Sequence, residues 1–278
     1  DRWDGQVYRR VLSCNGHTIA LAVSQSGSSM RPRLDVEISG RKASDADIPF
    51  ARAMLDRMLG LSVDLGDFYA DAKKDKRLGP LAERFRGMRP PRYPSLFEAL
   101  VNAIACQQMS LDVGIHLLNL LTAKYGRTAT SGADAMQAFP LPQTLAKLAP
   151  EDLRAVKFSR QKARAIIELG AGLAAGEIDV RALEAAPDDD ALAILLGLRG
   201  IGRWSAEYVL LRGLGRTHIF PGDDVGARRG LERWLGLGDK LPDYDSTNRA
   251  LQRWRKYAGL VYFHLLLARL EREGALTA

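Results

Sequence analysis

The sequence contains few residues that could build a disulfide or a zinc site. Its only cysteines are Cys14 and Cys106, too few for the disulfide framework of small secreted domains or for a four-cysteine zinc site. Cys106 lies in an apolar stretch, where a small core residue is more common than a nucleophile. The four histidines are scattered, at His17, His116, His218 and His264. They lack the spacing of zinc ligands, so we expect a structural or surface role for each.

The sequence also lacks an apolar run long enough to cross a bilayer as a helix, which takes about 20 residues. Its first residues do not combine a basic start, an apolar segment and a small-residue cleavage site, the pattern of a secretory signal. We therefore expect an intracellular protein with no membrane partner.

Acidic residues are outnumbered by basic ones. Lys and Arg number 40 against 33 Asp and Glu, which gives a formal net charge of +7 and a pI near 9.5. Between Arg199 and Lys256 there are 12 Lys or Arg and 7 Asp or Glu, a local net charge of +5. A moderately basic surface is often only a soluble surface. Concentration of the excess in one stretch favours an anionic partner such as nucleic acid.

The first part of the chain has the pattern of an antiparallel sheet. Residues 7–12, 18–25 and 33–39 alternate or cluster β-branched and apolar side chains. Asn15-Gly16 and Ser26-Gly27 supply turn residues between these segments. Hydrophobic residues make up 46% of the 278-residue chain, enough for a globular core in one large or two ordinary domains.

Helical periodicity takes over after the predicted strands, at residues 47–59 and about 65–86. Prolines then mark the passage to a second region, at Pro90, Pro91 and Pro94. We expect this second region to be almost wholly helical. The prediction is an α+β fold, with an antiparallel-sheet α/β lobe at residues 1–89 followed by a mainly α-helical region at residues 90–278.

Helices are expected in the second region at about residues 95–106, 111–125, 158–172, 188–196 and 203–212. Ser95 and Glu98 have the spacing of a capping box at the start of the first. In the last, the apolar residues Ala206, Val209 and Leu210 can face a partner helix. We expect its charged residues to face elsewhere, namely Arg203, Glu207 and Arg212.

A Gly-Ile-Gly turn stands immediately before the helix at residues 203–212. Gly200 and Gly202 leave no side chain in the way of a close approach to the backbone. The first N–H groups of the helix lack intrahelical partners, so this helix start suits a phosphate group. About twenty residues later comes the acidic pair Asp223 and Asp224, which either caps the next helix or provides a reactive carboxylate.

These motifs resemble the helix-hairpin-helix (HhH-GPD) DNA glycosylase superfamily, and most closely its AlkA-like 3-methyladenine DNA glycosylase II branch. Residues 198–202 match the family's Leu-Pro-Gly-Ile-Gly hairpin, with Arg199 in place of proline. Residues 221–224, followed by Arg228 or Arg229, match its aspartate loop, and residues 97–110 match its opening core helix and glutamine-rich turn. The resemblance covers about residues 90–270.

The resemblance implies that Asp224 is the catalytic carboxylate, with Asp223 as the alternative that otherwise caps the helix. In bifunctional members a lysine stands at the position of Trp204 and forms a Schiff base with the sugar, which an indole cannot do. We therefore expect a monofunctional enzyme that flips out and hydrolyses alkylated purines, of the 3-methyladenine and 7-methylguanine type, in base-excision repair. The alternatives are excision of oxidised or deaminated bases such as 8-oxoguanine and hypoxanthine, and a non-catalytic helix-hairpin-helix DNA-binding protein.

The resemblance and the helical spacing together give the expected site. The substrate pocket is predicted to include Trp204, Tyr208, Asp223, Tyr262 and Phe263. The residues expected to bind DNA are Gln107, Gln108, Met109, Arg199, Gly200, Ile201, Gly202, Arg203 and Ser205. Of these, Gln108 or Met109 would enter the base stack.

The expected partner is double-stranded DNA containing damaged bases, bound by a monomer. No cofactor is required in this prediction. Two cysteines exclude the four-cysteine iron–sulfur cluster that some relatives carry. The family resemblance implies a structural Na⁺ or K⁺ ion at the hairpin, held by the carbonyls of Leu198 and Ile201.

Overall fold

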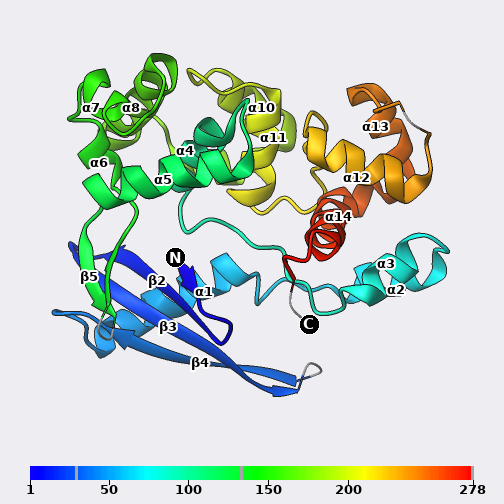
Figure 1. Ribbon diagram of the computed structural model, residues 1–278, viewed down its shortest axis with the longest axis horizontal. Coiled ribbons are helices and arrows are strands. Elements are labelled where there is room, and N and C mark those ends of the chain that lie inside the picture. The colour runs from blue at the N-terminus through cyan, green and yellow to red at the C-terminus, as the bar shows by residue number, and fades with distance from the viewer. Residues whose placement is uncertain (29–30, 132–133, 239, 277–278) are drawn as a thin grey trace. The chain divides into compact units, whose positions relative to one another are not determined.

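The computed structural model describes residues 1–28, 31–131, 134–238 and 240–276. It confirms the α+β class, because a small antiparallel sheet is followed mainly by helices (Figure 1). The chain forms two compact units. Unit 1 comprises Asp1–Asp56, Phe97–Ala182 and Leu198–Gly200, and unit 2 comprises Arg57–Leu96, Leu183–Gly197 and Ile201–Ala278. Each unit is assembled from separated stretches, so the consecutive division into residues 1–89 and 90–278 stays a prediction.

The sheet of unit 1 is antiparallel throughout, with the order β1-β2-β3-β4. Its strands are β1 (Arg2–Trp3), β2 (Val7–Cys14), β3 (His17–Ser28) and β4 (Arg31–Ser39). The predicted strands are confirmed and extend by a few residues at several ends. Asn15 and Gly16 join β2 to β3 with φ values of 44° and 83°. A two-residue turn with positive φ at both positions matches the twist of the strands beside it, which explains the Asn-Gly pair.

A second hairpin, β5 (Thr128–Ser131) with β6 (Asp134–Gln137), interrupts the helical region. The prediction that this region is almost wholly helical was wrong here. Each strand is only four residues long, too short to show a clear alternation. Tertiary packing holds the hairpin instead, because Ala129 and Met136 are buried in one cluster with Val11 and Ala20 of the sheet.

The helices of unit 1 contact one another and the sheet. They are α1 (Ile48–Leu59, which ends in unit 2), α4 (Leu96–Cys106), α5 (Leu111–Tyr125), α6 (Pro142–Leu145), α7 (Pro150–Arg154) and α8 (Arg160–Ala175). Both α6 and α7 contact α8. Glu98 of α4 forms a buried ion pair with Arg10 of β2, which joins the helix to the sheet.

Unit 2 is helical among the described residues. Its helices are α2 (Gly66–Lys74), α3 (Leu78–Arg84), α9 (Val180–Ala185, which begins in unit 1), α10 (Asp188–Leu196), α11 (Arg203–Arg212), α12 (Val225–Leu235), α13 (Tyr244–Leu251) and α14 (Ala258–Arg272), with a 3₁₀ segment η2 (Gln252–Tyr257). The segment expected to be largely helical, at about residues 65–86, contains two helices, because the Asp75 carboxylate accepts hydrogen bonds from the backbone of Arg77 and Leu78 and so starts α3.

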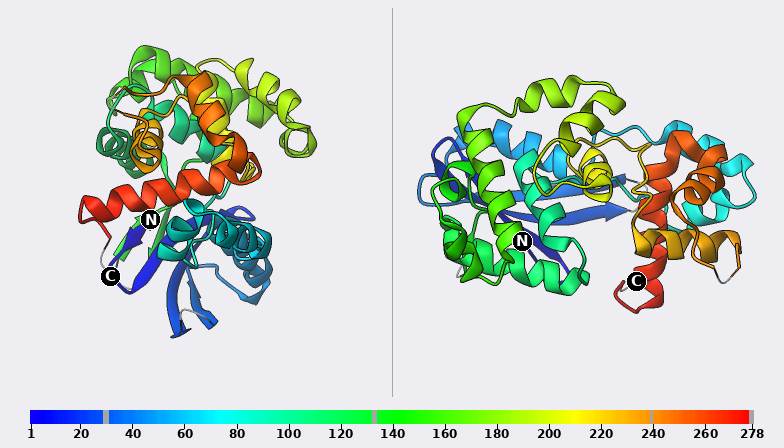
Figure 2. Two further views of the ribbon diagram at one scale, coloured as in Figure 1. Left: turned by 90° about the vertical axis from the view of Figure 1, so that its right-hand side faces the viewer. Right: turned by 90° about the horizontal axis from the view of Figure 1, so that it is seen from above.

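One core cluster joins α2 and α3 to α12 and α14. Figure 2 shows α14, in red, from two further sides. Buried residues of this cluster include Phe68, Leu231, Val261 and Phe263. No helix in the described part of the chain is long and apolar enough to cross a membrane.

Helix α11 has the predicted bounds but not the predicted charged face. Glu207 is only 6% exposed, although its charge led us to expect it to face away from the core. The expectation was wrong because the carboxylate finds hydrogen-bond partners inside unit 2, so its burial leaves no unsatisfied acceptor.

Candidate functional site

The carboxylate of Asp224 is held from three directions within unit 2. Asp224 is the N-cap of α12, and its Oδ1 accepts a hydrogen bond of 2.8 Å from the backbone N–H of Ala227. Its Oδ2 accepts hydrogen bonds from Trp204 Nε1 at 3.2 Å and from Tyr262 Oη at 3.3 Å. Of the acidic pair that could cap this helix, Asp224 and not Asp223 is the N-cap, and it still offers its second oxygen to the aromatic side chains.

Tyr262 is a neutral donor to this carboxylate. The side chain lies on α14 and the residue is 8% exposed. Burial, and then the negative charge of Asp224, raise the pKa of the Tyr262 phenol well above its usual 10. The phenol therefore keeps its proton at neutral pH and is a neutral hydrogen-bond donor to Asp224.

The two aromatic side chains that bind this carboxylate contact further aromatic rings. Trp204 and Tyr208, four residues apart on α11, stack with ring centroids 5.4 Å apart and an interplanar angle of 24°. Tyr262 meets Phe220 and Phe263 edge to face, each with a centroid distance of 5.7 Å. The four aromatic residues expected in the pocket therefore lie in one cluster, and Phe220 is an addition to it.

Two more members of this cluster were not predicted from the sequence. Tyr93, which precedes α4, places its hydroxyl 2.8 Å from that of Tyr208. Arg212 lies over three rings, with its guanidinium carbon 5.1 Å from the centroid of Tyr93, 5.8 Å from Tyr208 and 5.6 Å from Phe263. Arg212 continues the four-residue spacing of Trp204 and Tyr208, so the helical period could have revealed it. Tyr93 carries no such signal, because it is 115 residues from Tyr208 along the chain.

Asp223, the alternative catalytic residue, faces a different neighbour. Its carboxylate forms an ion pair of 2.7 Å with Arg203, whose side chain is half exposed. The guanidinium of Arg203 also lies over the ring of Tyr244, 3.8 Å from its centroid. The two consecutive aspartates therefore differ in their surroundings: Asp224 meets neutral aromatic donors, whereas Asp223 meets a cation.

Glu207 supports the loop that carries both aspartates. Its carboxylate accepts hydrogen bonds from the backbone N–H of Gly222 at 2.8 Å and from Tyr244 Oη at 2.6 Å. A Cβ at Gly222 would lie 2.6 Å from the Tyr244 ring, so the loop passes closer to that ring than any other residue would allow. Burial raises the pKa of the Glu207 carboxyl. This buried side chain fixes the loop two residues before Asp224.

The two hairpin glycines, Gly200 and Gly202, differ in backbone conformation and in surroundings. Gly200 has a φ of +79°, and a Cβ there would lie 2.8 Å from that of Ala165. Gly202 is the N-cap of α11 with an ordinary φ of −96°, and nothing lies within 4 Å of where its Cβ would be. The fold therefore requires glycine at position 200, whereas the space beside Gly202 is open.

The other predicted hairpin residues have varied surroundings. Arg199 forms an exposed ion pair of 2.5 Å with Glu168. Ile201 is 6% exposed and Ser205 is 1% exposed, so both side chains point into the protein. Only backbone groups of these two residues could reach DNA, whereas the side chain of Arg203 is half exposed.

The glutamine-rich turn between α4 and α5 contacts the hairpin within unit 1. The side-chain amide of Gln107 donates a hydrogen bond of 2.7 Å to the carbonyl of Gly200. Gln108 is exposed and has a φ of +55°, a conformation that few residues other than glycine adopt. Met109 is half buried, and its sulfur lies 3.8 Å from Lys162 Nζ. Of the two candidate wedges, Gln108 is the more exposed.

Lys162, which was not among the predicted site residues, holds this turn. Its ammonium donates to the carbonyls of Ala105 at 2.9 Å and Gln107 at 2.8 Å. These carbonyls lie at and just beyond the end of α4, where intrahelical donors run out and a cation is favoured. The position of the turn thus depends on a side chain more than fifty residues away in sequence.

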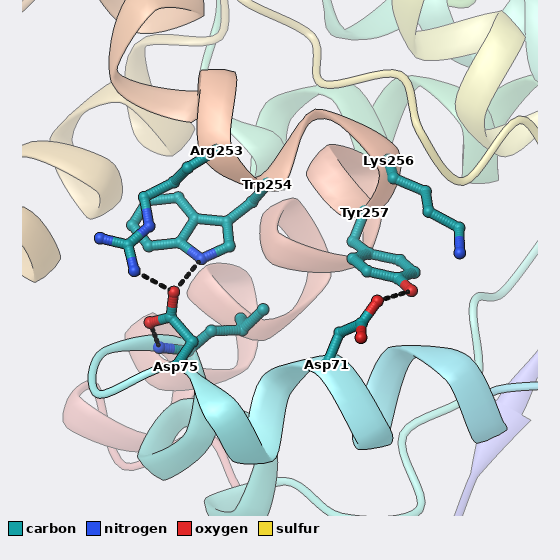
Figure 3. Close-up of a pocket in the computed structure, with 7 residues that line it drawn as sticks. Asp71, Asp75, Arg253, Trp254, Lys256 and Tyr257 are labelled. Atoms are coloured by element: carbon teal, nitrogen blue, oxygen red, sulfur yellow. Dashed lines mark hydrogen bonds and ion pairs between the residues drawn. The ribbon is translucent and has the colours of Figure 1, made fainter.

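A separate pocket of about 310 Å³ lies in unit 2 and contains none of the predicted site residues (Figure 3). Its polar groups are already engaged with one another. Asp75 accepts from Trp254 Nε1 at 3.0 Å and pairs with Arg253, and Asp71 accepts from Tyr257 Oη at 2.8 Å. These bonds join α2 to η2, which is a structural role.

This chain is similar to known proteins in sequence and in fold. The family "HhH-GPD superfamily base excision DNA repair protein" matches residues 101–256. A curated relative named DNA-3-methyladenine glycosylase, from Bacillus subtilis, is 32% identical over 74% of this chain and 67% of its own length. A probable N-glycosylase/DNA lyase from Methanothermobacter thermautotrophicus is 25% identical over 93% of this chain and 85% of its own. The solved structure of a 3-methyladenine DNA-glycosylase from Archaeoglobus fulgidus superposes with a TM-score of 0.84 at 27% identity, covering 99% of this chain and 90% of that one.

The raised pKa of Glu207 predicts a pH-dependent contribution to stability. A buried acid with a raised pKa holds its proton more tightly in the folded state, so the free energy of unfolding falls as pH rises from the ordinary value of 4.5 through the folded-state pKa. Glu207→Gln removes this titration, and its amide can still accept from Gly222 and donate to the Tyr244 oxygen. Relative to this variant, the native protein should lose stability as pH rises above 4.5. Urea unfolding of both proteins over a pH series measures this, and parallel stability profiles would contradict it.

The open space at Gly202 predicts that DNA binding can be weakened there without loss of stability. Asparagine is a favourable N-cap, so Gly202→Asn should preserve the free energy of unfolding while its side chain takes the N–H groups that a phosphate would use. Affinity for duplexes of every sequence should fall, and the logarithmic salt slope should become shallower by about 0.9 for each phosphate that the variant no longer binds. Gly200→Ala is the contrasting variant, expected to reduce stability. Unchanged affinity and salt slope in Gly202→Asn would place phosphate binding elsewhere.

Proposed function

Because this chain belongs to the HhH-GPD superfamily of base excision DNA repair proteins, we propose that it is a monofunctional DNA glycosylase that hydrolyses alkylated purines from double-stranded DNA. The substrates proposed are of the 3-methyladenine and 7-methylguanine type. The observation that carries this proposal is the Asp224 carboxylate, held by Trp204 and Tyr262 among aromatic rings. The names of the Bacillus and Archaeoglobus relatives support the same substrate class.

The proposed chemistry requires a fixed negative charge. Cleavage of an N-glycosidic bond passes through an oxocarbenium-like sugar, and a carboxylate near C1′ stabilises its positive charge and orients the attacking water. The donors to Asp224 Oδ2, an indole and a phenol, are both neutral. Asp223 is less suited to this task, because Arg203 already neutralises it.

The aromatic cluster supports recognition of an alkylated base. A purine alkylated on a ring nitrogen often carries a positive charge, which favours contact with the electron-rich faces of aromatic rings. The same positive charge makes the base a better leaving group, so little acid catalysis is needed at the base. Tyr208 and Trp204 would provide stacking surfaces for such a base after it leaves the duplex.

In the proposed mode of DNA binding, both backbone groups and side chains contact the DNA. The open start of α11 at Gly202 would bind phosphate through backbone N–H groups, with Arg203 beside it. Exposed Gln108 would occupy the space that the flipped nucleotide leaves, and the hydrogen bonds of Gln107 and Lys162 would hold its turn in place. The Na⁺ or K⁺ ion at the carbonyls of Leu198 and Ile201 stays a prediction.

The catalytic assignment predicts that Asp224→Asn removes base release but not folding. Asparagine caps a helix about as well as aspartate, so α12 should keep its start, while the negative charge is lost. Excision of 3-methyladenine should slow by at least about a hundredfold, with duplex affinity similar or higher. Asp223→Asn is the matched control, because it removes a surface ion pair one residue away and should leave excision nearly unchanged.

Two outcomes of this experiment would contradict the proposal. Near-normal excision by Asp224→Asn would exclude that carboxylate, and inactivity of Asp223→Asn alone would shift the assignment by one residue. Native protein is assayed in parallel on duplexes with alkylated purines, 8-oxoguanine, hypoxanthine and uracil. Preference for one of the last three would replace the alkylpurine substrate, and binding without any excision would leave a DNA-binding protein.

The proposed absence of lyase activity rests on Trp204. A lyase needs an amine to attack C1′, and the indole at this position has none that can form a Schiff base. The native protein should leave intact strands with abasic sites that break only after alkali treatment, and borohydride should trap no covalent complex with DNA. Because one relative is named a probable lyase, this test is informative. Borohydride trapping that disappears on mutation of a lysine elsewhere in the chain would overturn the proposal.

A further inference from the structure

Three side chains of unit 1 with metal-binding donors converge, and none of them is among the proposed active-site residues. They are Cys14 at the end of β2, His17 at the start of β3 and Asp47 in the 3₁₀ segment η1 (Asp45–Asp47). Their ligand atoms, the Cys14 sulfur, a ring nitrogen of His17 and a carboxylate oxygen of Asp47, all lie within 4.8 Å of one another. Neither the proposed glycosylase chemistry nor DNA binding uses any of them.

The backbone explains why these three meet. Cys14 and His17 are directly paired across the Asn15-Gly16 turn, so their side chains share one face of the hairpin. Asp47 reaches the same face from the capping box that begins η1, where its Oδ2 accepts a hydrogen bond of 3.0 Å from the backbone N–H of Ser44. The other oxygen, Oδ1, faces the Cys14 sulfur, and the His17 ring nitrogen lies almost equally close to both oxygens, 3.1 Å from Oδ1 and 3.2 Å from Oδ2.

The two distances to Asp47 suit a tetrahedral ion. Asp47 Oδ1 lies 3.4 Å from Cys14 Sγ and 3.1 Å from His17 Nε2. With Zn–S bonds of about 2.3 Å and Zn–N or Zn–O bonds of about 2.0 Å, tetrahedral geometry separates such ligand atoms by about 3.5 Å and 3.3 Å, respectively. Without a metal, the same distances allow a thiol and an imidazole to hydrogen-bond the carboxylate.

The charges and donor types also suit zinc. A thiolate and a carboxylate together carry two negative charges, which a divalent ion would neutralise in a place where Cys14 and Asp47 are 1% and 2% exposed. A sulfur, an imidazole nitrogen and a carboxylate oxygen favour Zn²⁺ over Mg²⁺ or Ca²⁺, which prefer oxygen alone. The Ser44 N–H on the second carboxylate oxygen is the kind of supporting bond that orients a metal ligand.

We propose that Cys14, His17 and Asp47 form a Zn²⁺ site with water as the fourth ligand. The side chain of His17 is 18% exposed, which gives an ion and its water access from solvent. Binding forms the Zn–S bond and releases the thiol proton of Cys14 to solvent, so uptake of the metal is accompanied by proton release. The ion would fasten the β2–β3 turn to η1.

Cobalt substitution tests the site in the untagged full chain. Co²⁺ in a tetrahedral site with a thiolate ligand gives a sulfur-to-metal charge-transfer band and intense visible bands. Native protein freed of metal with a chelator should bind one Co²⁺ per chain with both features, and Zn²⁺ should displace it. Cys14→Ser should lose the charge-transfer band. Cys106→Ser is the matched control, because it removes the only other cysteine, which lies outside the cluster. This variant should keep the charge-transfer band.

A second variant keeps the test decisive if Cys14→Ser does not fold. His17→Gln changes the least buried of the three ligands, and added Zn²⁺ should raise the thermal midpoint of the native protein but not of this variant. Native protein that binds neither Co²⁺ nor Zn²⁺ would overturn the proposal and leave a hydrogen-bonded cluster. A charge-transfer band that disappears in Cys106→Ser would assign the metal to Cys106 and would also overturn the proposal.

Discussion

The two carboxylate oxygens of Asp224 bind different groups, and these contacts determine the arrangement of the candidate site. One oxygen starts α12 by accepting the Ala227 N–H, and the other faces Trp204 and Tyr262. A side chain that caps a helix has little rotational freedom left, so its second oxygen has a fixed direction. The helix start thereby fixes the direction in which the proposed catalytic charge points, with no further loss of side-chain entropy.

The opposite wall of this site comes from one short helix, α11. Trp204, Tyr208 and Arg212 follow one another at four-residue spacing and build the aromatic side. Glu207 points to the loop that carries Asp223 and Asp224 and binds it through Gly222. A change in the direction of α11 would therefore move the rings and the carboxylate together. This shared support explains why a charged residue is buried at position 207, against the preference of its side chain for water.

The sequence predicted elements whose signals are local. The bounds of α10 and α11 follow from caps and glycines, and β2 and β3 follow from alternation around Asn15-Gly16. Contacts between distant segments gave no such signal. Tyr93, Lys162 and the β5–β6 hairpin acquire their roles only when the chain folds back on itself. Asp47 is the clearest example, because it lies 30 residues from His17 and joins Cys14 and His17 through a 3₁₀ segment. From the sequence we considered only the spacing of the histidines, and that spacing did not predict a zinc site.

The glycines show how stability and function can be separated in the candidate site. Gly200 and Gly222 are required by close neighbours, Ala165 and the Tyr244 ring, so their lack of a side chain serves packing. Gly202 has no such neighbour and an ordinary φ, so neither packing nor backbone strain accounts for glycine there. A residue that the fold does not require to be small, at the exposed start of a helix, is best explained by a ligand that approaches the backbone closely. A phosphate group of DNA meets that description.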